Sequence, residues 1–158
     1  MSVKVFLHGL EGSSQGTKSV FFKEWFPEMI IPDFEGSLKE RMLKLRKVLS
    51  GNANISLVGS SFGGLMATLF AFEEEERVDR LILLAPALNL MCFTLVKKMA
   101  ISIPVMIFHG RDDKVIPIRP IEQISDRIFQ DLTFNIVDDD HSLHSTFKKI
   151  GWEEILSS

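Results

Sequence analysis

Residues 55–69 constrain the fold of this 158-residue chain more than any other segment. They begin as a short strand-like run, ISLV, and end as a run of helix formers, LMATL. Between these runs, Gly59 and Gly63 flank Ser61 at two positions' distance, whereas the adjacent Ser60 lacks this pair of glycines. The five residues alone also fit a plain Gly-Ser loop. The flanking runs instead favour a sharp strand–turn–helix unit with Ser61 exposed at the turn, a nucleophile elbow.

Short apolar runs alternate with helix-like segments along the whole chain. We expect strands over residues 3–7, 29–32, 55–58, 80–84, 104–108 and 132–137, with Pro32 holding the second at a sheet edge. We expect helices over residues 17–26, 38–49, 62–72, 90–99, 118–129 and 145–156, with Thr17 as the first N-cap. This alternation predicts βαβ units in one α/β domain over residues 1–158. Its mostly parallel sheet of about six strands would have helices on both faces.

Composition and charge exclude several classes of function. The net charge is −3 and no basic stripe follows a helix, so we expect no nucleic-acid partner. No apolar run approaches the ~18 residues of a membrane span, and the amino terminus does not resemble a signal peptide. The single cysteine, Cys92, has no intramolecular disulfide partner. These features predict a cytoplasmic protein without membrane contacts, and they leave the oligomeric state open.

Serine, acid and histidine residues follow the predicted strands. Ser61 follows the third strand, Asp112 and Asp113 follow the fifth, and His141 and His144 follow the sixth. Because the carboxyl ends of parallel strands meet at one edge of a sheet, we expect these side chains to lie close together. The order Ser, Asp, His is typical of one class of serine-hydrolase triad. The residues themselves leave Asp112 open beside Asp113, and His144 open beside His141.

On these motifs the chain resembles the α/β-hydrolase superfamily. The resemblance is carried by residues 59–64 (GSSFGG), 8–10 (HGL), 109–117 (HGRDDKVIP) and 140–141 (DH). The opening residues 7–15, LHGLEGSSQ, are similar to the small, uncapped bacterial esterases of the YqiA-like group. The resemblance implies a three-layer α/β-hydrolase fold without a cap domain. It also implies a serine esterase with Ser61 as nucleophile, His141 as general base and Asp113 as the acid that orients the imidazole.

Further expectations follow from the resemblance. The backbone N–H groups of Leu10 and Phe62 would form the oxyanion hole, and an acyl-enzyme on Ser61 would be hydrolysed without a metal or cofactor. The substrate would be a small carboxylic ester; a thioesterase and a catalytically silent binding protein are the alternatives. We further hypothesise that the three acids at 138–140 raise the pKa of His141. The predicted substrate pocket consists of Leu10, Phe62, Pro86, Leu88 and Met91.

Overall fold

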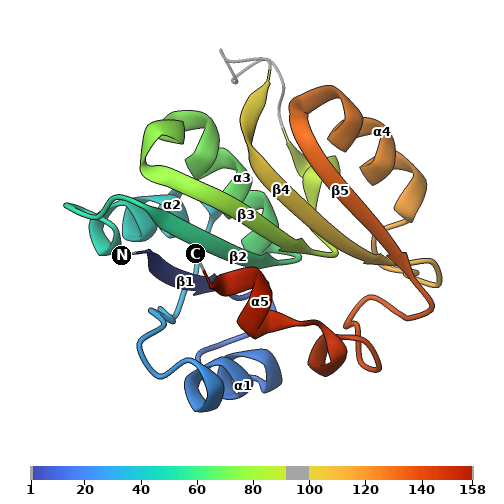
Figure 1. Cartoon of the computed structure of the whole chain (residues 1–158), viewed down its shortest axis with the longest axis horizontal. Coiled ribbons are helices and arrows are strands. Elements are labelled where there is room, and N and C mark those ends of the chain that lie inside the picture. The colour runs from blue at the N-terminus through green and yellow to red at the C-terminus, as the bar shows by residue number, and fades with distance from the viewer. Residues whose placement is uncertain (1, 92–99, 158) are drawn as a thin grey trace.

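The computed structural model describes residues 2–91 and 100–157, and a parallel β-sheet forms its centre (Figure 1). The five strands of this sheet lie side by side in sequence order, and every neighbouring pair is parallel. Parallel neighbours require a crossover between consecutive strands, and α-helices lie in the first, second and fourth of these connections. The strands are β1 (Val3–Leu7), β2 (Ile55–Ser60), β3 (Val78–Leu84), β4 (Ile101–Gly110) and β5 (Phe129–Val137).

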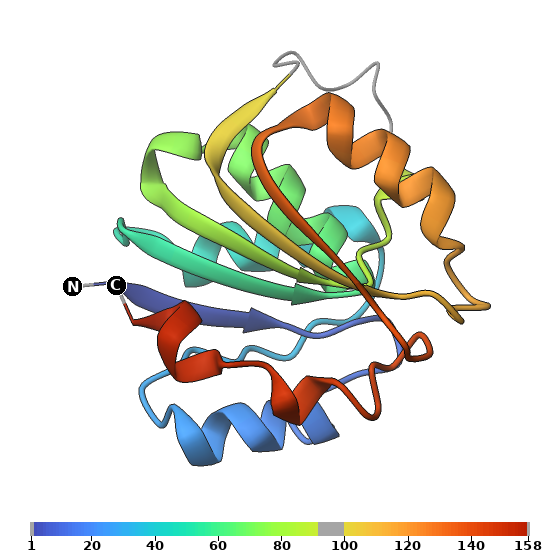
Figure 2. The same cartoon turned by 45° about the vertical axis from the view of Figure 1, so that its right-hand side comes forward.

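Helices cover both faces of the sheet, as predicted (Figure 2). One face carries α1 (Thr17–Trp25) and α5 (Trp152–Leu156). The other face carries α2 (Leu38–Val48), α3 (Phe62–Glu73) and α4 (Ile118–Ile128). Three 3₁₀ turns complete the described elements: η1 (Glu75–Arg77), η2 (Leu88–Leu90) and η4 (Phe147–Lys149).

The sheet divides the hydrophobic core into two parts. Because successive strand residues point to opposite faces, Leu57 of β2 packs into the cluster beneath α2, α3 and α4, whereas Val58 packs beneath α1 and α5. The second cluster is rich in aromatic rings. For example, the rings of Phe22 and Trp152 pack edge to face, with their centroids 4.9 Å apart. Burial on both faces explains why β2 and the second half of β3 read as continuous apolar runs, whereas the edge strand β5 is mostly exposed or half-buried and contains polar residues.

The prediction of a strand over residues 29–32 is wrong. Only Ile30 pairs with the sheet, through a single parallel bridge to Val5 at the edge. Phe6 N donates to Ile30 O, and Ile30 N donates to Lys4 O, both at 2.9 Å. Pro32 has no N–H with which to extend the ladder, so pairing ends there. The sheet therefore has five strands, one fewer than predicted.

The helix predicted over residues 145–156 is interrupted. It is replaced by η4 and α5, with Ile150 and Gly151 between them in non-helical conformations. The break lets Trp152 turn inward, where its Nε1–H donates to Phe147 O at 2.9 Å. Burial of this ring outweighs the helical pattern of the segment, because a large aromatic side chain contributes a few kcal/mol when it leaves water.

Smaller expectations concern the first N-cap, the cap domain, and the segment around Cys92. Thr17 is the first residue of α1 and not its N-cap; Gly16 takes that position without a side-chain cap. The connection from η2 to β4 consists only of residues 91–100, which is too short for a cap domain. Cys92 and most of the helix predicted over residues 90–99 lie outside the described residues. Among the helices that the structure describes, none is long and apolar enough to cross a membrane.

Candidate active site

The turn between β2 and α3 has the geometry of a nucleophile elbow. Ser61 lies at φ 54° and ψ −113°, a conformation that L residues rarely adopt. Its backbone is held there because Ser61 N donates to Leu84 O at 2.8 Å and Ser61 O accepts from Ala87 N at 2.9 Å. A Cβ on Gly59 would overlap the carbonyl of Gly63. The flanking glycines predicted from sequence are therefore required by the close packing of this turn.

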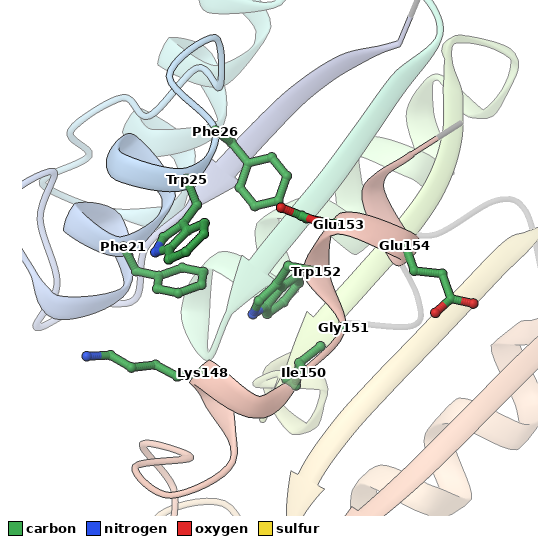
Figure 3. Close-up of a pocket in the computed structure, with 9 residues that line it drawn as sticks. All are labelled: Phe21, Trp25, Phe26, Lys148, Ile150, Gly151, Trp152, Glu153 and Glu154. Atoms are coloured by element: carbon green, nitrogen blue, oxygen red, sulfur yellow. The ribbon is translucent and has the colours of Figure 1, made fainter.

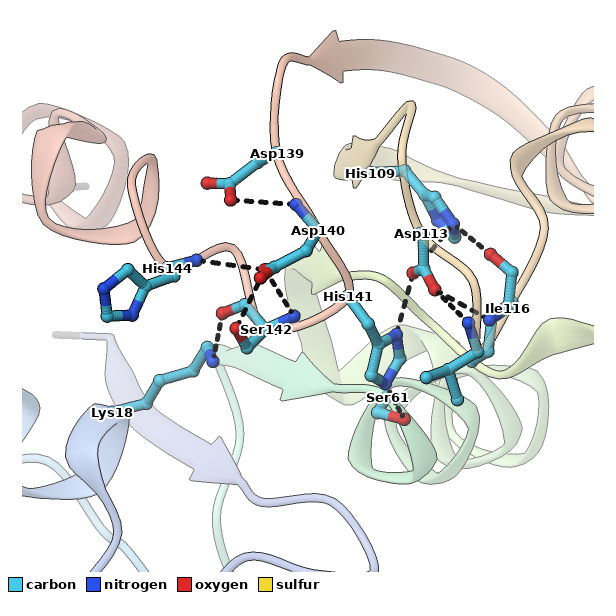
Figure 4. Close-up of polar contacts among 11 residues, drawn as sticks. Lys18, Ser61, His109, Asp113, Ile116, Asp139, Asp140, His141, Ser142 and His144 are labelled. Atoms are coloured by element: carbon cyan, nitrogen blue, oxygen red, sulfur yellow. Dashed lines mark hydrogen bonds and ion pairs between the residues drawn. The ribbon is translucent and has the colours of Figure 1, made fainter.

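Ser61, His141 and Asp113 form a continuous chain of contacts (Figure 4). His141 Nε2 lies 3.1 Å from Ser61 Oγ, and His141 Nδ1 lies 2.7 Å from Asp113 Oδ2. The other oxygen of Asp113 accepts hydrogen bonds from Val115 N at 2.9 Å and Ile116 N at 2.7 Å. The structure thus brings together three side chains that are far apart in sequence, each just after a strand.

The contacts define the hydrogen-bonding direction in this chain. An ionised carboxylate only accepts, so Asp113 requires the proton of a neutral His141 ring on Nδ1. Nε2 is then the acceptor for the hydroxyl proton of Ser61. The Asp113 side chain is buried and its four acceptor positions are largely used, so the carboxylate cannot rotate away from the imidazole.

A second histidine packs against the same carboxylate. His109 is fully buried, and its Nε2–H donates to Ile116 O at 2.8 Å while lying 3.3 Å from Asp113 Oδ2. Burial lowers the pKa of His109, although the Ile116 carbonyl and the Asp113 charge oppose the shift. Burial therefore favours the neutral ring of His109, which supports the loop after β4 through its bond to Ile116 O.

The loop that carries His141 is built by the acids that precede it. Asp139 accepts from the backbone N–H groups of Asp140, Ser145 and Thr146, at 2.8, 2.9 and 2.7 Å. Burial alone would raise the pKa of Asp139, but these bonds hold it below its usual value. The loop thus closes around the Asp139 carboxylate, with His141 projecting from it towards Ser61 (Figure 4).

The carboxylates at 138–140 are committed to other partners than His141. Asp138 forms an exposed ion pair with Arg111 at 2.9 Å. Asp140 accepts from Ser142 Oγ at 2.8 Å, which lowers the pKa of its carboxyl. The structure gives Asp139 and Asp140 a role in building this loop, beside the electrostatic role hypothesised from the sequence for the three acids. Lys18, on α1, also holds this loop, because its Nζ donates to Ser142 O at 2.7 Å.

Two backbone N–H groups beside Ser61 have no partner in the described part of the chain. They belong to Leu10 and Phe62, the residues predicted for the oxyanion hole. Phe62 is the first residue of α3, so its N–H is one of the free groups at the positive end of the helix. Gly9, just after β1, packs closely against the elbow, because a Cβ on Gly9 would lie only 3.3 Å from Ser61 Cβ.

The ring of His8 sets the orientation of the peptide that carries the Leu10 N–H. Phe34 N donates to His8 Nε2 at 2.9 Å, so Nδ1 carries the proton and donates to Gly9 O at 2.6 Å. The Gly9 carbonyl and the Leu10 N–H belong to one trans peptide and point in opposite directions. By holding the carbonyl, His8 directs the Leu10 N–H away from its own ring.

The residues that competed for these positions lie elsewhere. The carboxylate of Asp112 is exposed, and the ring of His144 points away from Ser61 (Figure 4). Ser60 ends β2 beside the elbow, and it is the hydroxyl of Ser61, not of Ser60, that contacts His141. Within residues 2–91 and 100–157, no group of three or more His, Cys, Asp or Glu side chains is arranged to bind a metal ion.

An open cleft of about 770 Å³ lies over Ser61 and His141. Of the predicted pocket residues, only Leu10 lines it. Leu88 and Met91 are buried in the core beneath α3 and α4, and Pro86 is buried against Gly64, so these three side chains do not line the cleft. They follow β3 directly, but the chain turns inward there because Ala87 N bonds Ser61 O. Phe62 instead stacks under the guanidinium of Arg41 at 5.4 Å.

The cleft also contains residues that sequence reasoning missed. Lys18 and Ser19 of α1, together with Val115 and Ser142, line it. Burial lowers the pKa of Lys18, although Asp140 and Asp139 oppose this shift. The apolar side chains of Leu10 and Val115 are 56% and 69% exposed at the opening. The exposure of Val115 next to Ser61 would have been the signal, but exposure is not visible in a sequence.

Comparisons with known proteins agree with this architecture. The sequence matches the model of the dienelactone hydrolase family over residues 12–145, whereas no curated protein sequence matches. Mouse alpha/beta hydrolase domain-containing protein 10 superposes with a TM-score of 0.77 at 18% identity, covering 98% of this chain and 90% of that one. Est1E from Butyrivibrio proteoclasticus with bound ferulic acid gives 0.74 at 17% identity, covering 99% and 90%.

A YdeN-like hydrolase from Pectobacterium atrosepticum is also similar, with a TM-score of 0.72 at 20% identity, covering 89% of this chain and 79% of that one. At these identities the structural likeness shows the fold, which is the α/β-hydrolase fold. The family model, in contrast, matches most of the chain, including the elbow, Asp113 and His141. The protein is therefore an α/β hydrolase that belongs to the dienelactone hydrolase family.

Proposed function

We propose that the protein hydrolyses carboxylic esters through an acyl-enzyme on Ser61. The observation that carries the proposal is the unbroken chain from Ser61 Oγ through His141 to the buried carboxylate of Asp113. In this geometry a serine hydroxyl has a base within hydrogen-bond reach, and that base is oriented by a third group.

Each half of the proposed reaction uses the same groups. His141 Nε2 accepts the proton as Ser61 Oγ attacks the ester carbonyl, and Asp113 stabilises the imidazolium that forms. The backbone N–H groups of Leu10 and Phe62 bind the oxyanion. His141 then gives its proton to the leaving alcohol, the C–O bond breaks, and the acyl group remains on Ser61. In the second half, a water molecule replaces the alcohol and the same steps release the acid.

Three observations support an ester as the substrate. The cleft is open and accommodates a small molecule at Ser61. Residues 7–15 resemble those of small YqiA-like esterases. Among the structural neighbours, Est1E was solved with ferulic acid bound, and LipS and LipT are described as lipolytic enzymes. A thioester would use the same groups, so rates on matched oxygen and thiol esters separate the two activities.

The proposal predicts covalent labelling by a fluorophosphonate probe. The probe should attach to the peptide that contains Ser61, and the protein should hydrolyse short-chain nitrophenyl esters. Mass spectrometry of the labelled peptide identifies the modified residue. A native, folded protein that neither labels nor hydrolyses would support the binding-protein alternative instead.

The hydrogen bond from His8 predicts an effect on turnover. We expect His8→Ala to lower kcat for acetate esters by about 10- to 100-fold with a smaller change in KM, because loss of one oxyanion donor costs about 10²–10³-fold and the Leu10 peptide would be misoriented without being removed. Steady-state kinetics beside thermal unfolding checks the result. The exposed His144→Ala is the matched control, and an unchanged kcat in folded His8→Ala would contradict this role.

A further inference from the structure

Two further hollows lie along α1, and shared residues connect them to the cleft at Ser61. The first, of about 600 Å³, shares Thr17 with the cleft. The second, of about 410 Å³, shares Phe21, Trp25 and Lys148 with the first. The second hollow lies between α1 and the segment that leads into α5 (Figure 3). We call the two hollows together the α1 groove.

One face of α1 forms the wall of this groove. Thr17, Phe21 and Trp25 are spaced four residues apart, so they lie in one row along the helix. With a rise of about 1.5 Å per residue, the row extends roughly 12 Å from the cleft. Through Thr17 the groove adjoins the cleft that Ser61 lines, and it reaches the aromatic hollow at Trp25.

The lining of the groove favours an apolar occupant. Val20 is 45% exposed and Trp25 is 61% exposed on this face. At the far end, Phe21, Phe26 and Trp152 surround the hollow, while Lys148 and Glu153 lie at its margin (Figure 3). Leu10 and Val115 add apolar surface at the opening of the cleft. Gln15, Thr17, Glu24 and Lys148 also line the groove, so its apolar side chains stand among polar ones. An unbranched aliphatic chain could still follow the apolar row of Val20, Phe21 and Trp25 along α1.

We propose that the α1 groove binds an aliphatic arm of the ester whose carbonyl lies at Ser61. The inference rests on the proposed function, and it names the substrate class as medium-chain esters. The arm belongs either to the acyl or to the alcohol part; both have the same chemistry, and the experiment separates them. Each buried methylene adds about fourfold to binding, since burial stabilises by about 0.8 kcal/mol per CH₂.

The two tryptophans of the chain allow a test that needs no turnover. Trp25 and Trp152 both line the second hollow, so intrinsic fluorescence reports its occupancy directly. Decanoate represents the acyl arm and decan-1-ol the alcohol arm. We expect a saturable fluorescence change with one or both, and none with acetate or ethanol. A response to decanoate alone assigns the groove to the acyl arm, and a response to decan-1-ol alone assigns it to the alcohol arm.

A matched pair of variants locates the binding. Val20→Glu places a charge in the groove without touching either tryptophan, and should weaken decyl binding at least tenfold. Leu43→Glu is the control, because Leu43 has a similar exposure on α2, which covers the opposite face of the sheet. No fluorescence response to either decyl compound, or an equal response in both variants, overturns the proposal.

Kinetics gives an independent reading. For nitrophenyl esters, or for alkyl acetates if the alcohol arm binds, kcat/KM should rise about two- to fourfold per methylene up to the decyl chain. Val20→Glu should flatten this series and leave acetate hydrolysis within twofold. A flat series with normal acetate hydrolysis refutes the groove but not the esterase. Decyl binding without any hydrolysis or labelling refutes the esterase but not the groove.

Discussion

Ser61→Ala is expected to lower kcat for ester hydrolysis by about 10⁶-fold and to abolish fluorophosphonate labelling. Losses of this size are typical when the nucleophile of a serine hydrolase is removed, because the acyl-enzyme can no longer form. The residual rate would come from the oxyanion hole and substrate binding alone. Stopped assays with nitrophenyl acetate, at high protein concentration, measure a rate this low.

Ser60→Ala is the matched control for this experiment. Ser60 precedes Ser61 and lines the same cleft, but it ends β2 and lacks the contact to His141. Its loss should change kcat by less than about threefold. Ser61→Ala should leave the melting temperature nearly unchanged, because serine and alanine meet the same backbone strain at φ 54°. Full activity in Ser61→Ala, or labelling at Ser60, would refute the assignment.

Asp113→Asn is expected to lower kcat by about 10⁴-fold near pH 7, with little change in KM. The size of the effect is that seen when the acid of such a triad is replaced by its amide. Val115 N and Ile116 N both donate to Oδ1, so the amide oxygen of the new side chain would occupy that position. Its NH₂ group would then face His141 Nδ1 and force the proton onto Nε2. A protonated Nε2 cannot accept the Ser61 proton.

Asp112→Asn is the control for this prediction. The Asp112 carboxylate is exposed and adjacent in sequence, so the same change of charge occurs without any change at the imidazole. We expect kcat within about twofold of the native protein. If Asp113→Asn keeps more than a tenth of the native kcat while remaining folded, the orienting role of this carboxylate is wrong. If Asp112→Asn is the variant that loses activity, the two acids have been assigned in reverse.

The meeting of Ser61, Asp113 and His141 could be predicted because the strands that precede them are parallel. Every strand that precedes Ser61, Asp113 or His141 ends at the same edge of the sheet, so a residue directly after a strand lies near the others. The glycines around Ser61 are readable for a similar reason, since the tight turn leaves no space for a Cβ. In contrast, the burial of Pro86, Leu88 and Met91 after β3 cannot be predicted, because nothing in the local sequence distinguishes a chain that turns into the core.

What the sequence by itself determined is the α/β architecture and the strand ends from which Ser61, Asp113 and His141 project. Hydrophobic periodicity and glycine spacing are local properties, so they can be read from the sequence without the structure. Only the tertiary structure decided that His141 and not His144 faces Ser61, since that depends on how the Asp139 carboxylate closes its loop. The same holds for the α1 groove and for the break before Trp152, because both arise from packing between segments more than a hundred residues apart.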